Sequence, residues 1–203
     1  MKLTPVSVTV LLICLALSTA ASVSGTTPAS ARAAIHRTAE IQSLAGYFPA
    51  ARQYPAGYKA MAVQQYSNPG QLFTNGNVSL ARRDRLMMGA MQTAINRHDV
   101  VATIMIARFR TPTPARRFSS SVQSDVTPDD KEKSGTIRSL GSTRARYVTG
   151  DCAGCGPTAP PLYQVFFARG PIFVEISTQP RDQTATQYLA RLIDGKLKSR
   201  GFR

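Results

Sequence analysis

The chain of 203 residues has room for one ordinary domain, and its 43% hydrophobic and 18% charged residues are typical of a folded globular protein. Lys and Arg number 25 against 11 Asp and Glu, so the protein is strongly basic, with a formal net charge of +14. Two histidines and three cysteines are too few for a histidine-rich metal site or a four-cysteine zinc site.

The N-terminus has the layout of a secretory signal peptide. Lys2 supplies a positive charge, an apolar run extends from Val8 to Leu17, and small residues occupy positions 18–22. A transmembrane helix needs about 20 apolar residues, so this run is too short to span a bilayer. We predict cleavage after Ala20 or Ala21 and a secreted or extracytoplasmic product with no transmembrane segment. A short membrane anchor or a buried helix is the alternative.

Removal of the signal peptide divides the chain into three predicted parts. Residues 1–21 are the signal peptide, residues 22–31 form a flexible leader of small residues and proline, and residues 32–203 form a single domain. Cys14 lies inside the apolar run and follows Ile13, which is unlike a lipoprotein cysteine. We therefore expect Cys14 to be removed with the signal peptide.

The first half of the domain combines helical and strand patterns. A short helix is predicted over residues 32–44 and a strand over residues 58–66. The strongest helical pattern covers residues 79–98, where Ser79 is a candidate N-cap and apolar residues recur at helical spacing. His98 would then stand at the C-terminal end of this helix, where its side chain complements the helix dipole.

A strand and a helix follow directly. β-branched residues predict a strand over residues 100–109, and Pro114, at the first helical position, predicts a helix from Thr113 to about residue 124. Residues 136–140 and 144–148 then form a predicted hairpin around Gly and Ser.

The C-terminal third contains the clearest pair of strands. Strands over 162–168 and 172–177 are joined by so short a segment that they must be antiparallel. Asp182 caps a predicted last helix that runs to about residue 199. The sequence therefore predicts the α+β class, with an antiparallel sheet of about five to six strands packed against helices as an α/β sandwich.

Two stretches carry a resemblance to a known group of proteins. They are VVATIMIARFRTPTPARRF, from residue 100, and YQVFFARGPIFVEISTQPRDQTATQYLARLIDGKL, from residue 163. Both resemble parts of small secreted actinobacterial proteins with a Mog1/PsbP-like α/β sandwich. The resemblance implies an accessory or sensor-like domain without catalytic activity, and it carries over no catalytic residue.

Cys152 and Cys155 form a Cys-x-x-Cys motif, for which three interpretations stay open. An oxidising compartment favours a short disulfide that closes the loop between residues 150 and 161. Thiol-disulfide exchange is the second interpretation, although glycine and proline around the motif disfavour the helix start that thioredoxin-like proteins use. A metal site is the third, and it lacks further histidine or cysteine ligands nearby.

Other catalytic chemistry finds little support in the sequence. There is no Gly-x-Ser-x-Gly motif, no glycine-rich phosphate loop after a strand, and no candidate pair of buried carboxylates. His98 and Asp99 are adjacent in sequence, and neighbouring side chains point in different directions, which disfavours a triad. We therefore predict no enzyme activity, no catalytic residue, no metal and no cofactor.

The basic residues gather in three clusters. The first two supply the candidate anion-binding residues, which are Arg82, Arg83, Arg85, Arg108, Arg110, Arg116 and Arg117. The third contains Lys196, Lys198, Arg200 and Arg203. These clusters are either solvated helix ends or surfaces for an anionic polymer, a phospholipid or extracellular nucleic acid. Few aromatic residues lie among them, which disfavours specific nucleic-acid binding.

These observations predict a secreted, non-enzymatic binding or interaction domain at the cell envelope, whose partner is an unknown protein or small molecule. One alternative is a charge-driven binder of anionic polymers or membrane surfaces. The other is a thiol-disulfide active protein that works through Cys152 and Cys155.

Overall fold

The computed structural model describes residues 43–73, 75–124, 133–142, 145–151 and 158–203. The predicted signal peptide and leader lie outside the described residues, and so do Cys152 and Cys155 and nearly all of the helix predicted over 32–44. These features therefore stay predictions.

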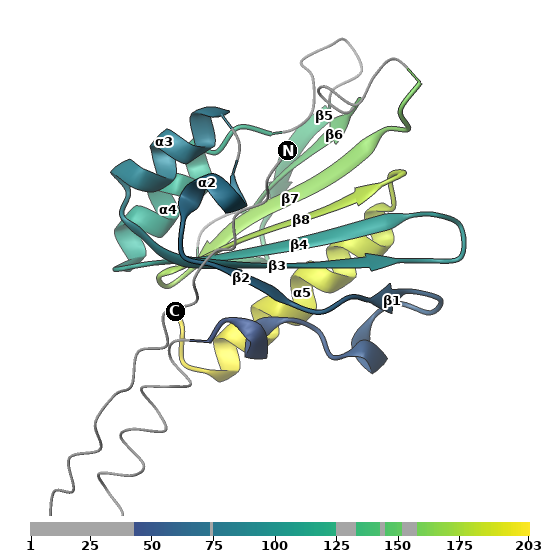
Figure 1. Cartoon of the computed structure of the whole chain (residues 1–203), viewed down its shortest axis with the longest axis horizontal. Coiled ribbons are helices and arrows are strands. Elements are labelled where there is room, and N and C mark those ends of the chain that lie inside the picture. Colours follow the sequence, from purple (N-terminus) through teal and green to yellow (C-terminus); the bar gives the residue numbers. More distant parts are fainter. Residues whose placement is uncertain (1–42, 74, 125–132, 143–144, 152–157) are drawn as a thin grey trace, which may run out of the picture. The chain divides into compact units, whose positions relative to one another are not determined.

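The described part of the chain is built on an eight-stranded antiparallel sheet (Figure 1). The strand order is β1-β3-β4-β8-β7-β6-β5, and β2 also pairs with β3. The bounds are β1 Lys59–Ala60, β2 Gln64–Tyr66, β3 Leu86–Ile95, β4 Val101–Phe109, β5 Lys133–Ile137, β6 Ala145–Gly150, β7 Leu162–Arg169 and β8 Ile172–Gln179. The predicted α+β class is confirmed, and the sheet is larger than the five to six strands expected.

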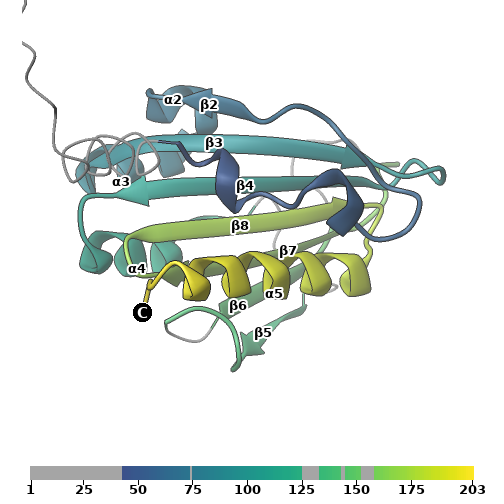
Figure 2. The ribbon, with the colours of Figure 1, turned by 90° about the horizontal axis from the view of Figure 1, so that it is seen from below.

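Helices cover both faces of the sheet (Figures 1 and 2). One face carries α5 (Gln183–Ser199) and the short 3-10 helices η1 (Ala45–Tyr47) and η2 (Ala51–Gln53). The other carries α2 (Pro69–Leu72), α3 (Asn75–Arg83) and α4 (Pro112–Ser121). No helix of the described residues is both long and apolar enough to cross a membrane.

The alternation of β4 shows how the two faces are filled. Ile104 and Ile106 are buried in the core cluster that includes α5, whereas Ala107 and Phe109 are buried in the cluster that includes α4. Successive side chains of a strand point to opposite faces, so a central strand with helices on both sides is apolar throughout. This explains why the strand predicted over 100–109 has a nearly continuous apolar sequence.

The helix predicted over 79–98 is wrong from residue 84 onward. Helix α3 ends at Arg83, Arg85 adopts a left-handed φ of 56°, and β3 then begins at Leu86. Pairing of β3 with β4 along its length outweighs the helical preference of its Met, Ala and Leu residues. Ser79 consequently lies inside α3 and is not an N-cap, and His98 lies exposed in the turn before β4 rather than at a helix end.

Most other predicted elements are confirmed. Helix α4, the β5–β6 hairpin and the antiparallel β7–β8 pair all occur close to their predicted positions. Asp182 caps α5, because its Oδ1 accepts a hydrogen bond of 2.9 Å from the backbone N–H of Ala185. The strand predicted over 58–66 is divided into the two short strands β1 and β2.

A buried ion pair joins α5 to the sheet. Arg169, at the end of β7, donates to both carboxylate oxygens of Asp194 on α5, with 3.2 Å between Nη2 and Oδ2. The backbone N–H of Gly141, in the β5–β6 turn, also donates to Oδ1 of Asp194 at 3.2 Å. Asp194 therefore holds three segments together within the core.

Candidate anion-binding site

Four of the predicted arginines line one cavity of about 260 Å³. The lining residues are Arg83, Asp84, Arg85, Arg110, Thr111, Pro114 and Arg117. They come from the end of α3, the turn into β3, the end of β4 and α4. The first two basic clusters of the sequence therefore meet at one place in the fold.

Strand register explains why the two clusters meet. Leu86 at the start of β3 pairs with Phe109 at the end of β4. The residue before Leu86 and the residue after Phe109, Arg85 and Arg110, consequently flank the same end of the β3–β4 pair. Arg85 has a left-handed φ, which ends the helical conformation that continues from α3. The backbone N–H of Arg85 donates to the carbonyl of Arg82 at 3.1 Å.

Asp84 organises the arginines on one side of the cavity. Its side chain is fully buried, and it accepts hydrogen bonds from Arg117 Nε at 2.7 Å and from Arg83 Nε at 3.2 Å on the same oxygen, Oδ1. Arg83 Nη2 donates to the other oxygen, also at 3.2 Å. Both guanidinium groups are thereby fixed in position, since each makes two contacts with a single carboxylate.

The pKa of Asp84 reflects these contacts. Burial raises the pKa of the carboxyl, but the hydrogen bonds and positive charges of Arg83 and Arg117 outweigh burial, so the pKa lies below its usual value of 3.8. Asp84 is therefore ionised at neutral pH and offsets one of the positive charges around the cavity.

The cavity keeps a surplus of accessible positive charge. Four guanidinium groups against one carboxylate leave a formal charge of +3. The side chains of Arg83 and Arg117 remain 52% exposed in spite of their ion pairs. Arg85 and Arg110 are exposed, and neither has an ion pair among the described residues. Donors therefore remain free for a ligand.

The N-terminus of α4 adds to the positive potential. Thr111 is its N-cap and lines the cavity, and no hydrogen bond of the Thr111 side chain caps the helix. The positive end of the helix dipole favours an anion at this position. Pro112 and Pro114 lack backbone N–H groups, so side-chain donors rather than backbone amides dominate the cavity.

The remaining candidate arginines lie elsewhere. Arg82 on α3 and Arg116 on α4 are exposed and do not line the cavity. Arg108 lies two residues after Ile106 and four after Ile104 on β4, so all three are on the same face of the sheet. This is the face that carries α5. Sequence reasoning missed Asp84, whose signal is a lone acidic residue within the arginine-rich run from 82 to 85.

The third basic cluster makes structural contacts. Lys196 Nζ donates to the carbonyl of Phe48 at 2.6 Å, and the Arg200 guanidinium lies 4.8 Å from the ring centroid of Tyr47. Lys198 pairs with Asp194 at 3.0 Å. Two of these contacts hold the segment around η1 against the C-terminal end of α5.

The donor set around the cavity suits an oxyanion. Guanidinium groups bind carboxylates and phosphates through paired N–H donors, and they cannot ligate a metal cation. No group of three or more His, Cys, Asp or Glu side chains within the described ranges could hold a metal ion.

No protein-family model matches the chain, and no curated protein matches it. The extracellular domain of PknH from Mycobacterium tuberculosis is a solved structure similar to it, with a TM-score of 0.43 and 12% sequence identity over 71% of this chain and 86% of that chain.

Proposed function

We propose that the protein is a non-enzymatic binding domain that holds an anionic group, a phosphate or a carboxylate, in the cavity of Arg83, Arg85, Arg110 and Arg117. The convergence of four guanidinium groups from α3, the turn into β3, the end of β4 and α4 supports this proposal most directly. A merely solvated basic surface would keep its like charges apart, because they repel one another. Here a buried carboxylate, Asp84, holds two of them in place.

The sequence supports placing this domain outside the cytoplasm. The signal-peptide pattern of residues 1–21 would export residues 22–203, in which a leader of ten residues precedes the domain. Anionic groups exposed at a cell envelope would then be the available ligands. Mass measurement of the exported protein tests this division, since cleavage after Ala20 or Ala21 gives two closely defined masses.

A site-specific binder and a charge-driven binder differ in how they respond to single arginine replacements. In a site, only arginines that line the cavity matter. In charge-driven adhesion, every exposed arginine contributes about equally through its charge. Arg110 and Arg116 make this comparison possible, because both are exposed and only Arg110 lines the cavity.

The experiment is a titration of the wild type and two variants with inorganic phosphate and with acetate at low salt, followed by amide chemical shifts. We expect Arg110→Gln to weaken phosphate binding about tenfold, the loss of one charge-assisted hydrogen bond. Arg116→Gln, the matched control, should keep wild-type affinity. Equal weakening by both variants would favour the charge-driven alternative, and no saturable binding of either anion would contradict the proposal.

A further inference from the structure

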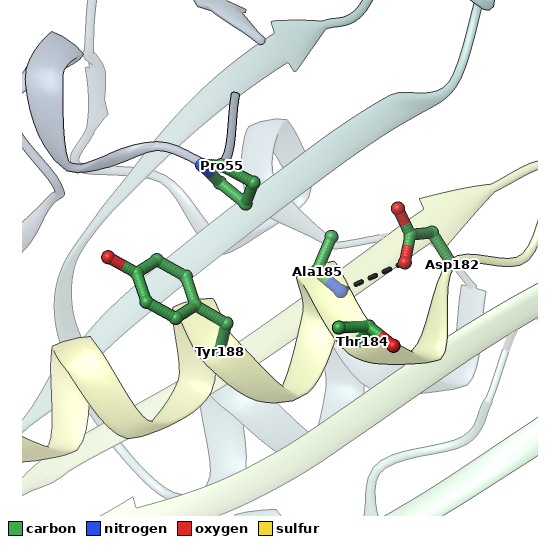
Figure 3. Close-up of a pocket in the computed structure, with 5 residues that line it drawn as sticks. All are labelled: Pro55, Asp182, Thr184, Ala185 and Tyr188. Carbon is green, nitrogen blue, oxygen red and sulfur yellow. Dashed lines mark hydrogen bonds between the residues drawn. The ribbon is translucent and has the colours of Figure 1, made fainter. Parts of the chain in front are cut away.

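A second cavity lies on the opposite face of the sheet, where α5 begins. It measures about 340 Å³ and is lined by Pro55, Asp182, Thr184, Ala185 and Tyr188 (Figure 3). This volume is at the lower end of the range for small-molecule sites, about 300–1,000 Å³. Its size therefore suits a compact ligand.

The walls of this cavity are mainly apolar. Figure 3 shows the Tyr188 ring and the Asp182 carboxylate toward opposite ends, with Pro55 facing Ala185 between them. Tyr188 is 46% exposed, although large aromatic side chains are usually buried. An exposed ring and a proline ring thus border a hollow that ends at one carboxylate.

Asp182 is held rigidly by neighbours from three segments. Oδ1 accepts from the N–H of Ala185 at 2.9 Å, and Oδ2 accepts from the hydroxyl of Tyr58 at 3.3 Å. The backbone N–H of Asp182 donates to Oγ1 of Thr178 at 2.9 Å. A carboxylate accepts about four hydrogen bonds, so Asp182 keeps capacity for a ligand donor.

Asp182 is the only charged residue among the described residues that line this cavity. Burial, then the negative charge of Asp182 and its hydrogen bond, raise the pKa of Tyr58 to about 12. Arg181, the neighbouring cation, donates toward Oγ1 of Thr149 on β6 at 3.5 Å. The helix dipole contributes only about half a positive charge at this end, less than the full charge of the carboxylate.

We propose that this cavity binds a primary alkylammonium group. The ammonium donates to Asp182 at one end of the cavity, and the methylene stem lies against Pro55, Ala185 and the ring of Tyr188. An anion is disfavoured by the carboxylate. This site has the opposite charge preference from the arginine cavity and does not depend on it.

The first test compares three ligands of equal chain length on the full domain. n-Hexylamine, n-hexanol and hexanoate are titrated separately, and binding is followed by the amide chemical shifts of Ala185 and Tyr188. We expect saturable millimolar binding of the amine, at least fivefold weaker binding of the alcohol, and none of hexanoate. Equal binding of amine and alcohol, or tighter binding of hexanoate, would overturn the proposal.

Substitutions at Asp182 and Tyr188 test the contribution of each residue to amine binding and distinguish it from a loss of folding. Asp182→Asn removes the charge and keeps a good N-cap, so it should weaken n-hexylamine binding about tenfold and leave n-hexanol binding unchanged. Tyr188→Ser removes the ring that packs against the methylene stem and should weaken amine binding about threefold, whereas Tyr188→Phe, the matched control, keeps the ring and should keep the affinity. Unchanged amine affinity in a folded Asp182→Asn variant contradicts the proposal. If that variant does not fold, the two Tyr188 variants decide, and equal amine affinity in both contradicts it.

The natural source of the ammonium is either a free amine or a lysine side chain. 1,5-Diaminopentane and the amide of Nα-acetyl-lysine carry the same group in these two contexts. Tighter binding of the diamine supports the alkylammonium site with a free amine as its ligand, and tighter binding of the lysine derivative supports it with a peptide as its ligand. Failure of both to bind contradicts the proposed ligand class.

Discussion

Asp84 and Arg117 form an ion pair between the end of α3 and the middle of α4, across 33 positions of sequence. The pair joins the end of α3 to α4, and it fixes one wall of the arginine cavity. Its two members have different surroundings, because the Asp84 side chain is fully buried whereas that of Arg117 is 52% exposed. Asp84 is therefore the structural member and Arg117 the one available to a ligand.

Replacing Asp84 by Asn should destabilise the domain. The variant loses charge-assisted hydrogen bonds from two arginines and leaves like charges facing each other, a change of about 1–3 kcal/mol. Urea unfolding at neutral pH measures this difference. Arg82→Gln, at an exposed residue outside the cavity, is the control and should stay within about 0.5 kcal/mol of the wild type. Equal stability of Asp84→Asn and wild type would show that the ion pairs contribute nothing.

The contribution of Asp84 should depend on pH. Its native pKa lies below the usual 3.8, so the unfolded chain takes up a proton at higher pH than the folded one. The stabilisation is fully present above the unfolded pKa and is lost as the pH falls through the native pKa. We expect the stability difference between wild type and Asp84→Asn to be constant from about pH 5 to 7 and to shrink below about pH 4. A difference that grows with acidity would contradict this assignment.

Replacing Gly89 or Gly195 by alanine should change the stability of the domain in opposite directions. A Cβ at Gly89 would lie 2.0 Å from Cδ2 of Leu72, which packs α2 against β3. Gly89→Ala should therefore cost about 1–3 kcal/mol by overpacking. Gly195 lies inside α5 with nothing within 4 Å of such a Cβ, so Gly195→Ala should stabilise by up to about 1 kcal/mol. Thermal unfolding compares both variants with the wild type, and a stable Gly89→Ala protein would mean that α2 moves freely.

Breaking the buried Arg169–Asp194 ion pair should strongly lower the free energy of unfolding. Arg169→Met leaves a buried carboxylate with weaker compensation, and we expect a loss of about 3 kcal/mol in the free energy of unfolding. Lys198 contacts the same carboxylate from a side chain that is 53% exposed. Lys198→Met is the matched control and should change stability by less than about 1 kcal/mol. Similar losses in the two variants would show that burial does not distinguish these partners.

The Cys152–Cys155 disulfide stays a proposal that a thiol count can test. Because the exported protein would fold in an oxidising compartment, we expect no reactive thiol in the denatured, unreduced mature chain and two after reduction. Two reactive thiols before reduction would contradict the disulfide. A Cys152→Ser, Cys155→Ser double variant that loses thiol-disulfide exchange activity while staying folded would favour the redox alternative.

The elements predicted correctly are those whose local signals agree with their final environment. Helix α5 has both an aspartate cap and a helical apolar stripe, and β4 is rich in β-branched residues. Strand β3 is different, because Leu, Met and Ala favour helices and only pairing with β4 decides its state. That pairing is a long-range property, which the periodicity of one segment does not contain.

The sequence predicts which arginines are candidates for anion binding, but it does not predict which of them meet in one cavity. Sequence clustering identifies Arg83, Arg85, Arg110 and Arg117 together with arginines that lie elsewhere. Separating them requires the end of α3 and the β3–β4 register, which place Arg85 beside Arg110. The role of Asp84 could not be predicted from the sequence, because a single carboxylate among arginines resembles an ordinary surface charge. Only its burial in the structure distinguishes it.

The sheet lies between α4 and α5 (Figures 1 and 2). The arginine cavity is lined by residues of α4 and the Asp182 cavity by residues of α5, so the two cavities are associated with different sides of the sheet. A molecule bound at one cavity does not sterically block the other. With both proposed ligands in place, the domain would be a bivalent adaptor that joins an anionic molecule to an amine-bearing one. Occupancy of each site would then be limited by its own ligand concentration rather than by competition.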